Sequence, residues 1–555
     1  MIDAALTHGW SGVVLTYTAV HAPMIAGVLR ARGRLTHYML SPIAAIPLTA
    51  VAAVGAVVSS ACLGRLGVAN HGLLQLTFAA CLSATLGYAG GKVLVQGREP
   101  DKYHRRGTLV ADSPDTASSI SRDVGDAGIT LAGMAVPAWD EAKHFKLIGT
   151  TGTGKSTAIR EILASALARG DRAVVADPDG GYLQRFYRPE RGDLVLNPFD
   201  ARSVKWDLFS EIDNGYDVEQ LARSLVPDDD GQDRSWRGYA RTFFTAVTRQ
   251  AHEAGIRDVD ELYRLLVVAE STELRGLVRG TPAQPFLDEH NSRMFDSIRS
   301  VTSSAVAALE YFGRQRAPAF SVRKWIANKA PGVLFIPYKA NQIAALRSTI
   351  SAWMRLAIFE SMERDEEGRE GGDSDSRLWF IVDELDALGA IDGLKDALAR
   401  LRKFGGRCVL GFQSIAQVSS TYGQGAAHTI VENCGNTLIL RCSASEGGGT
   451  ARFASQLIGE REVTHTTVSR SRRVTEIAGS VSHTEHLKVE PAILPSQIEQ
   501  LPDLAGYLKY ASDPRWQRVR LEAAQAWEKR LRDATVDGSQ GRDSSGRRHE
   551  GASRE

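Results

Sequence analysis

The stretch that decides the fold reads Gly149-Thr150-Thr151-Gly152-Thr153-Gly154-Lys155-Ser156. Residues His144 to Ile148 before it predict a short strand, and a helix is expected to begin near Thr157. This is the GxxxxGK[ST] pattern in its strand-to-helix setting, where glycines let backbone amides turn inward around phosphates. It predicts that Lys155 reaches the β- and γ-phosphates of ATP and that Ser156 ligates Mg²⁺. The predicted nucleotide-binding residues are Gly149, Thr150, Thr151, Gly152, Thr153, Gly154, Lys155, Ser156 and Thr157. The alternative is a glycine turn that binds no nucleotide.

A second motif supplies the carboxylates that such a site requires. Residues Leu378 to Val382 are all bulky aliphatic or aromatic types, which predicts a fully buried parallel strand. Asp383 and Glu384 follow at its carboxyl end, where ligands bind in parallel sheets. We expect Asp383 to contact Mg²⁺, through Ser156 or water, and Glu384 to act as the catalytic residue on the attacking water. The alternative is that this acidic pair caps the following helix.

The rest of the soluble part favours an α/β fold. From about Val136 onward, short β-branched runs alternate with longer amphipathic ones, which is typical of βαβ units. Cys408 to Phe412 predicts another buried strand, and it ends at Gln413. A polar residue at that position of a RecA-like sheet can sense the γ-phosphate, and a glutamine that merely caps the strand is the alternative. Asn436 to Arg441 predicts a further strand.

Composition excludes several classes of protein. A chain of 555 residues buries a large core, which excludes a small stapled scaffold. The net charge is only +1, so contact with nucleic acid requires a local patch. The cysteines form no CxxC pair and have no metal-ligand spacing, which indicates reduced thiols in a reducing compartment. They are Cys62, Cys81, Cys408, Cys434 and Cys442.

The first hundred residues predict a membrane anchor. Leu35 to Gly64 and Leu66 to Gly91 contain no Lys, Arg, Asp or Glu, and each is longer than the roughly 20 residues that span a bilayer. We expect transmembrane helices at about 38–63 and 68–91, with a pair of buried core helices as the alternative. The small residues Gly87, Gly90 and Gly91 would let these helices approach closely.

Charges flank the two uncharged runs unevenly. The loop between them carries only Arg65, so the positive-inside rule predicts that both outer flanks are cytoplasmic. Ala4 to Leu29 is also uncharged but contains polar residues and a proline. We expect an interfacial or weakly inserted segment there, with a third span as the alternative. The flanking cations are Arg30, Arg32 and Arg34 on one side and Lys92, Arg98, Lys102, Arg105 and Arg106 on the other.

Several stretches in a fixed order carry a family resemblance. They are HFKLIGTTGTGKSTAIREIL, RAVVADPDGGYLQRF, LVLNPFDARSVKWDLFSEI, LWFIVDELDALG with LARLRKFGGRCVLGFQS, and LPDLAGYLKY. Preceded by two spans, they resemble the type IV secretion coupling proteins of the TraD and TrwB kind, up to about Tyr510. The resemblance implies a membrane-anchored hexameric ATPase whose RecA-like motor is interrupted by a small all-α domain. The turn Asp177 to Gly181 departs from the family pattern, so no role is carried over to it.

The resemblance and the helical periodicity together predict the domain organisation. Within the predicted all-α domain, Trp236, Ala240 and Phe243 share one apolar helical face, which favours core, and a DNA-binding surface of these aromatics and the nearby arginines is the alternative. The expected parts are a membrane region at 1–95, a linker and entry to the motor at 96–135, the first RecA-like part at 136–211, the all-α domain at 212–319, the second RecA-like part at 320–515, and a charged helix with a disordered tail at 516–555.

The resemblance also implies that a neighbouring subunit completes the site. In ring ATPases an arginine acts in trans to stabilise the transition-state charge. The resemblance points to Arg402, in the RKFGG stretch, as this catalytic residue, and Arg441 is the second candidate.

The function implied is an ATPase in the bacterial inner membrane, multi-pass, with its motor in the cytoplasm. It would recruit relaxase-bound DNA, or effector proteins, to a type IV secretion channel, with ATP and Mg²⁺ as cofactors and a homohexamer as the active form. Contact with DNA would be independent of sequence. Two alternatives are a chromosome-partition-type membrane DNA translocase and a non-catalytic membrane receptor for secretion substrates.

Overall fold

The computed structural model describes residues 10–31, 35–65, 72–96, 102–111, 128–227, 234–328, 331–363, 377–445, 448–471 and 480–522. The chain forms two compact units. One comprises residues 1–105 and 462–488, and the other comprises residues 106–461 and 489–555.

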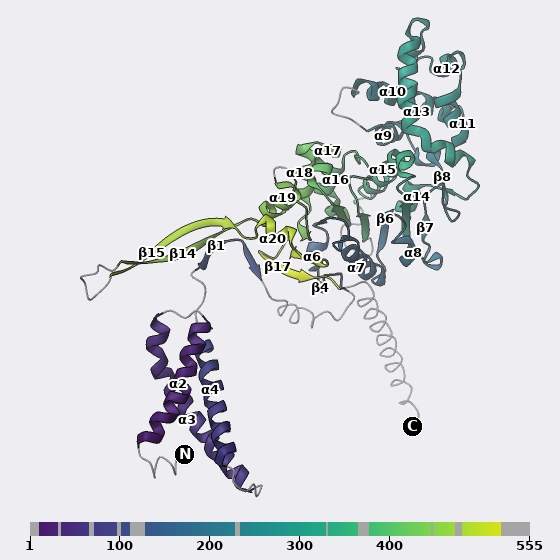
Figure 1. The fold of residues 1–555 in the computed structure, drawn as a ribbon. Helices are drawn as coiled ribbons and strands as arrows, with labels where there is room; N and C mark the ends of the chain where they lie inside the picture. Colours follow the sequence, from purple (N-terminus) through teal and green to yellow (C-terminus); the bar gives the residue numbers. More distant parts are fainter. Residues whose placement is uncertain are drawn as a thin grey trace, which may run out of the picture. The chain divides into compact units, whose positions relative to one another are not determined.

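The first unit begins with three long helices, α2 (Trp10–Arg30), α3 (Leu35–Arg65) and α4 (Gly72–Gln96) (Figure 1). Helix α3 carries the span predicted at 38–63, and α4 carries the described part of the span predicted at 68–91. Among the described residues, Val13–Arg30 and Leu35–Ser59 are long and apolar enough to cross a membrane.

The segment before α3, expected to be interfacial or weakly inserted with a third span as the alternative, is helical. Helix α2 is continuous over 21 residues, which favours the third-span alternative. Its polar side chains find partners on the next helix: His21 Nε2 lies 3.0 Å from Ser41 Oγ, and the Tyr17 hydroxyl donates to the Pro42 carbonyl at 3.0 Å. These contacts satisfy polar groups that made the segment look unsuited to a bilayer.

Gly87 and Gly91 bring α4 into close contact with α2, and not with α3 as the sequence analysis expected. A Cβ added at Gly87 would overlap the carbonyl oxygen of Val20, and one at Gly91 would overlap that of Met24. Only a residue without a side chain allows two helical backbones to approach so closely.

A three-stranded sheet of order β1-β14-β15 was not predicted. Its strands are β1 (Lys102–Gly107), β14 (Glu460–Ser471) and β15 (Ser480–Pro491). The sequence analysis assigned residues 460–491 to the second RecA-like part, but most of them group with the first unit. Alternation is weak in this polar stretch, so the period-2 signal of a strand is hard to see.

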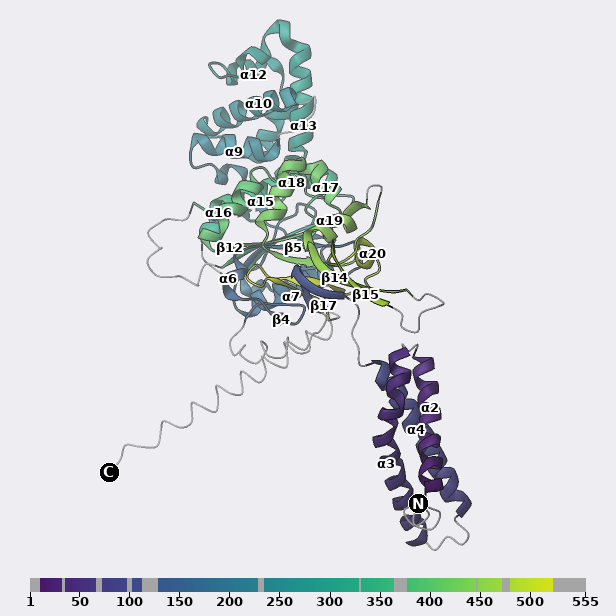
Figure 2. The same cartoon turned by 90° about the vertical axis from the view of Figure 1, so that its left-hand side faces the viewer.

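The second unit is built on a ten-stranded sheet of order β2-β17-β16-β13-β5-β12-β11-β6-β10-β7. Figure 2 labels β5 and β12 from the middle of this sheet. The seven strands from β13 to β7 run parallel, and β16 and β17 add on in antiparallel fashion. The strands are β2 (Leu109–Ala111), β5 (Phe145–Ile148), β6 (Arg172–Pro178), β7 (Leu194–Val195), β10 (Val333–Tyr338), β11 (Leu378–Val382), β12 (Gly406–Phe412), β13 (Asn436–Ile439), β16 (Ala505–Lys509) and β17 (Arg515–Arg520).

Alternating side chains of the parallel strands divide the core into two layers. On one face, residues such as Phe145 and Ile381 pack with helix α7 (Lys155–Ala168). On the other face, residues such as Phe380 and Leu410 pack with α15 (Ile343–Glu360), α16 (Leu394–Leu401) and α18 (Gln424–Asn433). This three-layer α/β arrangement confirms the predicted fold class.

The structure around residue 516 differs from the prediction. The charged helix expected from residue 516 does not begin there, because β17 continues to Arg520 and pairs with β16. Trp516 and Val519 are buried in the core, which explains why this charged stretch is a strand. Residues 523–555, which include the predicted tail, lie outside the described residues.

A helical insertion lies between β8 (Lys205–Trp206) and β9 (Ala319–Phe320), which pair with each other in a separate two-stranded sheet. Phe243 and Phe244 are fully buried, which agrees with core aromatics. The 212–319 domain boundaries stay a prediction. The main helices are α9 (Gly215–Leu225), α10 (Arg234–Glu253), α11 (Val259–Tyr263), α12 (Ser271–Leu277) and α13 (Ser292–Arg314).

Candidate nucleotide-binding site

The phosphate loop, residues 149–156, connects β5 to α7 at the carboxyl end of the sheet, and α7 begins at Lys155, slightly earlier than expected. The amide of Thr150 donates to the Arg441 carbonyl at 2.9 Å, and the Leu504 amide donates to the Thr153 carbonyl at 2.9 Å. Gly154 has a φ of +118°, and a Cβ there would lie 2.9 Å from the Leu504 side chain. The loop is therefore fixed in a shape that favours glycine.

Lys155 points into its own loop. Its Nζ donates to the Gly149 carbonyl at 2.7 Å, and the side chain is buried. Burial lowers the pKa of Lys155, while the charges of Asp383 and Glu384 act in the opposite direction. A lysine held on loop carbonyls in this way lies where the phosphates of a nucleotide bind in such loops.

Asp383 meets the phosphate loop across 227 positions of sequence. Ser156 Oγ donates to Asp383 Oδ2 at 2.7 Å, and the Tyr182 hydroxyl donates to the same oxygen at 2.8 Å. Asp383 Oδ1 is buried and makes no hydrogen bond with any described residue. A hydroxyl and a carboxylate with a free oxygen fit Mg²⁺, which prefers few protein ligands beside phosphate and water.

Glu384 belongs to a second polar chain. Gln413 Nε2 donates to Glu384 Oε1 at 2.9 Å, and Thr151 Oγ1 of the phosphate loop donates to Gln413 Oε1 at 3.0 Å. Burial and the neighbouring Asp383 raise the pKa of Glu384. Gln413 thus links the Glu384 carboxylate to the phosphate loop, whereas a glutamine that only capped the strand would make neither contact.

Three polar residues beside Asp383 were not predicted as site residues, namely Asp177, Tyr182 and Tyr338. The buried Asp177 accepts from the amides of Tyr182 and Leu183, and burial raises its pKa to about 6. Tyr338, at the end of β10, is buried too, and its hydroxyl has no partner among the described residues. The usable signal was the place of Asp177 and Tyr338 near the carboxyl ends of two strands, β6, which neighbours β11, and β10, which neighbours β6.

The structure separates Arg402 from the predicted site residues of its own chain. Arg402 is exposed and precedes β12, which pairs in parallel with β5. The seven residues of β12 span roughly 20 Å, so Arg402 lies at the opposite end of the sheet from the phosphate loop. Arg441 lies close to the loop, but its guanidinium pairs with Asp503 at 2.6 Å.

A parallel sheet with a phosphate loop after one strand and an acid-ended strand two positions away defines a RecA-like P-loop domain. This domain is interrupted by helices and preceded by apolar helices. The chain belongs to the type IV secretion-system coupling proteins, because the model of that family's DNA-binding domain matches residues 128–522. The family indicated by the sequence motifs is thereby confirmed.

Known proteins of this family are similar to the chain over most of its length. It is 30% identical over 409 residues to the coupling protein TraD of Escherichia coli (strain K12), covering 72% of this chain and 56% of TraD. It resembles the plasmid coupling protein TrwB in complex with the non-hydrolysable ATP analogue ADPNP, with 30% identity and a TM-score of 0.66 over 77% of this chain and 96% of TrwB. TrwB with ADP and Mg²⁺ matches equally well, with 30% identity and a TM-score of 0.66 over 77% and 95% of the two chains.

Proposed function

We propose that this protein is a membrane-anchored ATPase that couples ATP hydrolysis to the delivery of DNA or protein substrates to a type IV secretion channel. The observation that carries the proposal is the contact of Ser156 with Asp383, beside Glu384 and Gln413. It joins the two halves of a nucleotide-hydrolysing site. TrwB, solved with an ATP analogue and with ADP and Mg²⁺, supports the choice of ligands.

Each residue of the site has a distinct task in this proposal. Lys155 leaves the Gly149 carbonyl to bind the β- and γ-phosphates, and Ser156 with Asp383 would hold Mg²⁺. The bound ion would neutralise charge on the phosphate oxygens. Glu384, whose raised pKa suits proton acceptance, orients and activates the attacking water. Gln413 reports the presence of the γ-phosphate, since it contacts both Glu384 and the loop.

The cargo and the assembly are part of the same proposal. The partners would be DNA carrying a relaxase, or effector proteins, together with components of the channel, and the active form would be a homohexamer in the bacterial inner membrane. TraD bears the description of a coupling protein, which supports this assignment over a chromosome-partition translocase. The complete set of site residues speaks against a receptor without catalysis.

The first test concerns Arg402. Since it lies far from its own phosphate loop, it acts on a neighbour, and Arg402→Ala should bind ATP normally but hydrolyse it about 1000-fold more slowly. Mixing Arg402→Ala with Lys155→Ala subunits rebuilds a complete site at a shared interface, so phosphate release should exceed the sum of the two separate proteins. No recovery in verified mixed assemblies would assign the trans role to another residue, with Arg441 the next candidate.

DNA binding should be electrostatic and indifferent to sequence. With a net charge of +1, a few local Lys and Arg side chains must supply the contacts. For single-stranded DNA, the logarithm of the affinity should fall by about 0.7 per neutralised phosphate for each tenfold rise in salt. Fluorescence anisotropy with oligonucleotides of unrelated sequence measures this slope. An affinity independent of salt, or confined to one sequence, would contradict a translocating motor.

The membrane topology follows from α2 as a third span. Reporter fusions at Arg98 and at the C-terminus should report the cytoplasm, while fusions at Arg65 and at the N-terminus should report the opposite side. A cytoplasmic reporter at Arg65 would contradict the anchor altogether. A cytoplasmic N-terminus with an external Arg65 would return α2 to the membrane surface.

A further inference from the structure

Two of the four residues before β5, Glu141 and His144, contact the segment that carries Arg402 at both of its ends. This segment, residues 398–408, comprises the end of α16, a 3-10 turn (Arg402–Phe404) and the start of β12. We call residues 141–144 the clamp. The clamp leads directly into β5 and the phosphate loop, so it belongs to the frame that holds the nucleotide site of the same subunit.

His144 holds the segment at two points. Its Nδ1 accepts from the amide of Cys408 at 3.1 Å, so the ring proton lies on Nε2, which donates to the Leu398 carbonyl at 2.9 Å. Burial lowers the pKa of His144 to about 4, which keeps the ring neutral and this tautomer in place. His144 also has a φ of +56°, a region that costs a side-chain-bearing residue energy and is retained where the surroundings require it.

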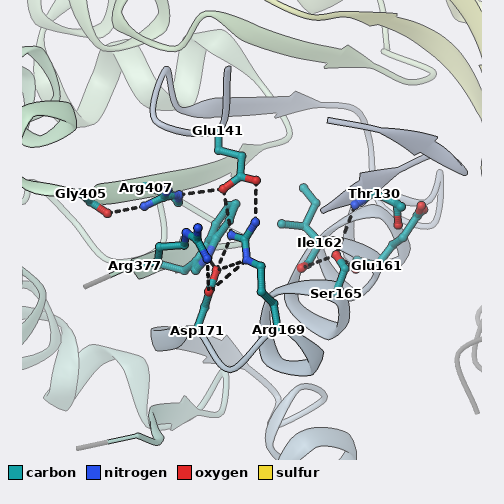
Figure 3. A network of polar contacts seen from close by, with 11 residues as sticks. Thr130, Glu141, Glu161, Ile162, Ser165, Arg169, Asp171, Arg377, Gly405 and Arg407 are labelled. Atoms are coloured by element: carbon teal, nitrogen blue, oxygen red, sulfur yellow. Dashed lines mark hydrogen bonds and ion pairs between the residues drawn. The ribbon is translucent and has the colours of Figure 1, made fainter. Parts of the chain in front are cut away.

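Glu141 provides the third point through Arg407 (Figure 3). Arg407 Nε donates to Glu141 Oε2 at 3.0 Å, and its Nη1 donates to the Gly405 carbonyl at 2.5 Å, one residue after the Arg402 turn. Although burial acts in the opposite direction, the hydrogen bonds and charges of Arg169 and Arg407 hold the pKa of Glu141 below its usual value.

The same carboxylate is tied to the helix of the phosphate loop. Arg169, directly after α7, donates to both oxygens of Glu141 at 2.7 and 2.8 Å and pairs with Asp171 (Figure 3). Glu141, Asp171 and Arg407 are buried. A buried ion network is a poor source of stability because desolvation offsets the attraction, whereas it can fix one arrangement of the chain.

We propose that Glu141, His144 and Arg407 are positioning residues. They hold the Arg402 turn in the position from which Arg402 can reach the nucleotide site of a neighbouring subunit. This inference rests on the proposed action of Arg402 in trans. Through Arg169 and β5, the nucleotide loop of one subunit and the arginine it donates share one rigid frame. A displacement of about 1 Å at a reacting centre can cost 100-fold in rate. A small shift of Arg402 after loss of the clamp should therefore lower the rate of ATP hydrolysis measurably.

The test measures donation of the arginine separately from folding and nucleotide binding. Full-length Glu141→Gln keeps the shape of the side chain but removes its charge, and it should hydrolyse ATP 10- to 100-fold more slowly while binding ATP within about twofold of wild type. Mixed with Lys155→Ala, which donates a good arginine, it should recover turnover; mixed with Arg402→Ala, it should not. Adding Glu141→Gln to Arg402→Ala should slow the enzyme no further.

Two further variants guard against a loss of folding. Asp193→Asn is the matched control. Asp193 is also a buried carboxylate, it pairs with Arg191 at 2.6 Å, and neither residue has a hydrogen bond or ion pair to Glu141, His144 or Arg407 in the described part of the chain. This variant should leave turnover unchanged. Arg407→Lys keeps a positive charge beside Glu141 but loses the fork that reaches Gly405, and it should behave like Glu141→Gln.

The outcomes separate this inference from the function on which it rests. Recovery in the Arg402→Ala and Lys155→Ala mixture, without recovery for Glu141→Gln or Arg407→Lys, overturns the clamp alone. Wild-type turnover in both Glu141→Gln and Arg407→Lys overturns it as well. No recovery in the Arg402→Ala mixture removes the trans arginine and the clamp with it.

Discussion

Lys155→Ala is expected to hydrolyse ATP at least 10,000-fold more slowly than the wild-type protein. The change removes the one ammonium group that the loop itself directs toward the phosphates, and with it charge stabilisation both in the bound state and in the transition state. Phosphate release by the full-length protein in detergent, at millimolar ATP with Mg²⁺, measures the effect.

The control for this variant is Lys324→Ala, which removes an exposed lysine far from the loop in sequence and should hydrolyse ATP at the wild-type rate. Undiminished hydrolysis in Lys155→Ala would exclude the assigned loop as the catalytic site. A similar loss in both variants would indicate damage to the fold and not to the site.

Glu384→Gln is expected to bind ATP with Mg²⁺ and to lose about 10,000-fold in turnover. The substitution removes the proton acceptor but leaves Ser156, Asp383 and Lys155 in place, so the binding contacts remain. Titration with a fluorescent ATP analogue and a single-turnover measurement on the same preparation separate binding from chemistry.

Glu219→Gln is the matched control, because Glu219 is an exposed carboxylate paired with Arg249 on the helical insertion. It should bind and hydrolyse ATP normally. If Glu384→Gln hydrolyses ATP at the wild-type rate, another group activates the water. If it fails to bind nucleotide, Glu384 serves binding and not catalysis.

Local patterns were sufficient for the strands and loop at the centre of the fold. The all-apolar run Leu378–Val382 is β11 with those same bounds, because a strand buried on both faces leaves no polar position to blur its ends. The phosphate loop likewise lies between a strand and a helix. The phosphate loop and the acid-ended strand were both recognisable, because each motif consists of residues next to each other in sequence.

Contacts between distant segments could not be predicted in this way. The Tyr182 hydroxyl bonds to Asp383 across 201 positions, and His144 bonds to Cys408 across 264. Such pairs depend on the order of strands in the sheet, which no local pattern specifies. The role of Glu141 was hidden for the same reason, because its partners Arg169 and Arg407 lie 28 and 266 positions away, after α7 and in β12.

Polar stretches were the other source of error. The polar residues of α2 left its place between an interfacial segment and a third span open, and two of them, His21 and Tyr17, bond to α3. The strand β17 was hidden by its arginines, since its two buried residues, Trp516 and Val519, lie three positions apart on opposite faces and leave no period-2 pattern. In both cases the partner segment, and not the segment itself, determines the structure.

The central claim is that this chain is a motor in which ATP hydrolysis at the Lys155 site responds to its DNA cargo. The most direct measurement is the ATP turnover of the full-length wild-type protein with Mg²⁺, with and without single-stranded DNA long enough to template a ring. We predict hydrolysis that requires Mg²⁺ and rises on addition of DNA, with neither property in Lys155→Ala. ATP binding without any hydrolysis, in the presence or absence of DNA, would contradict the account.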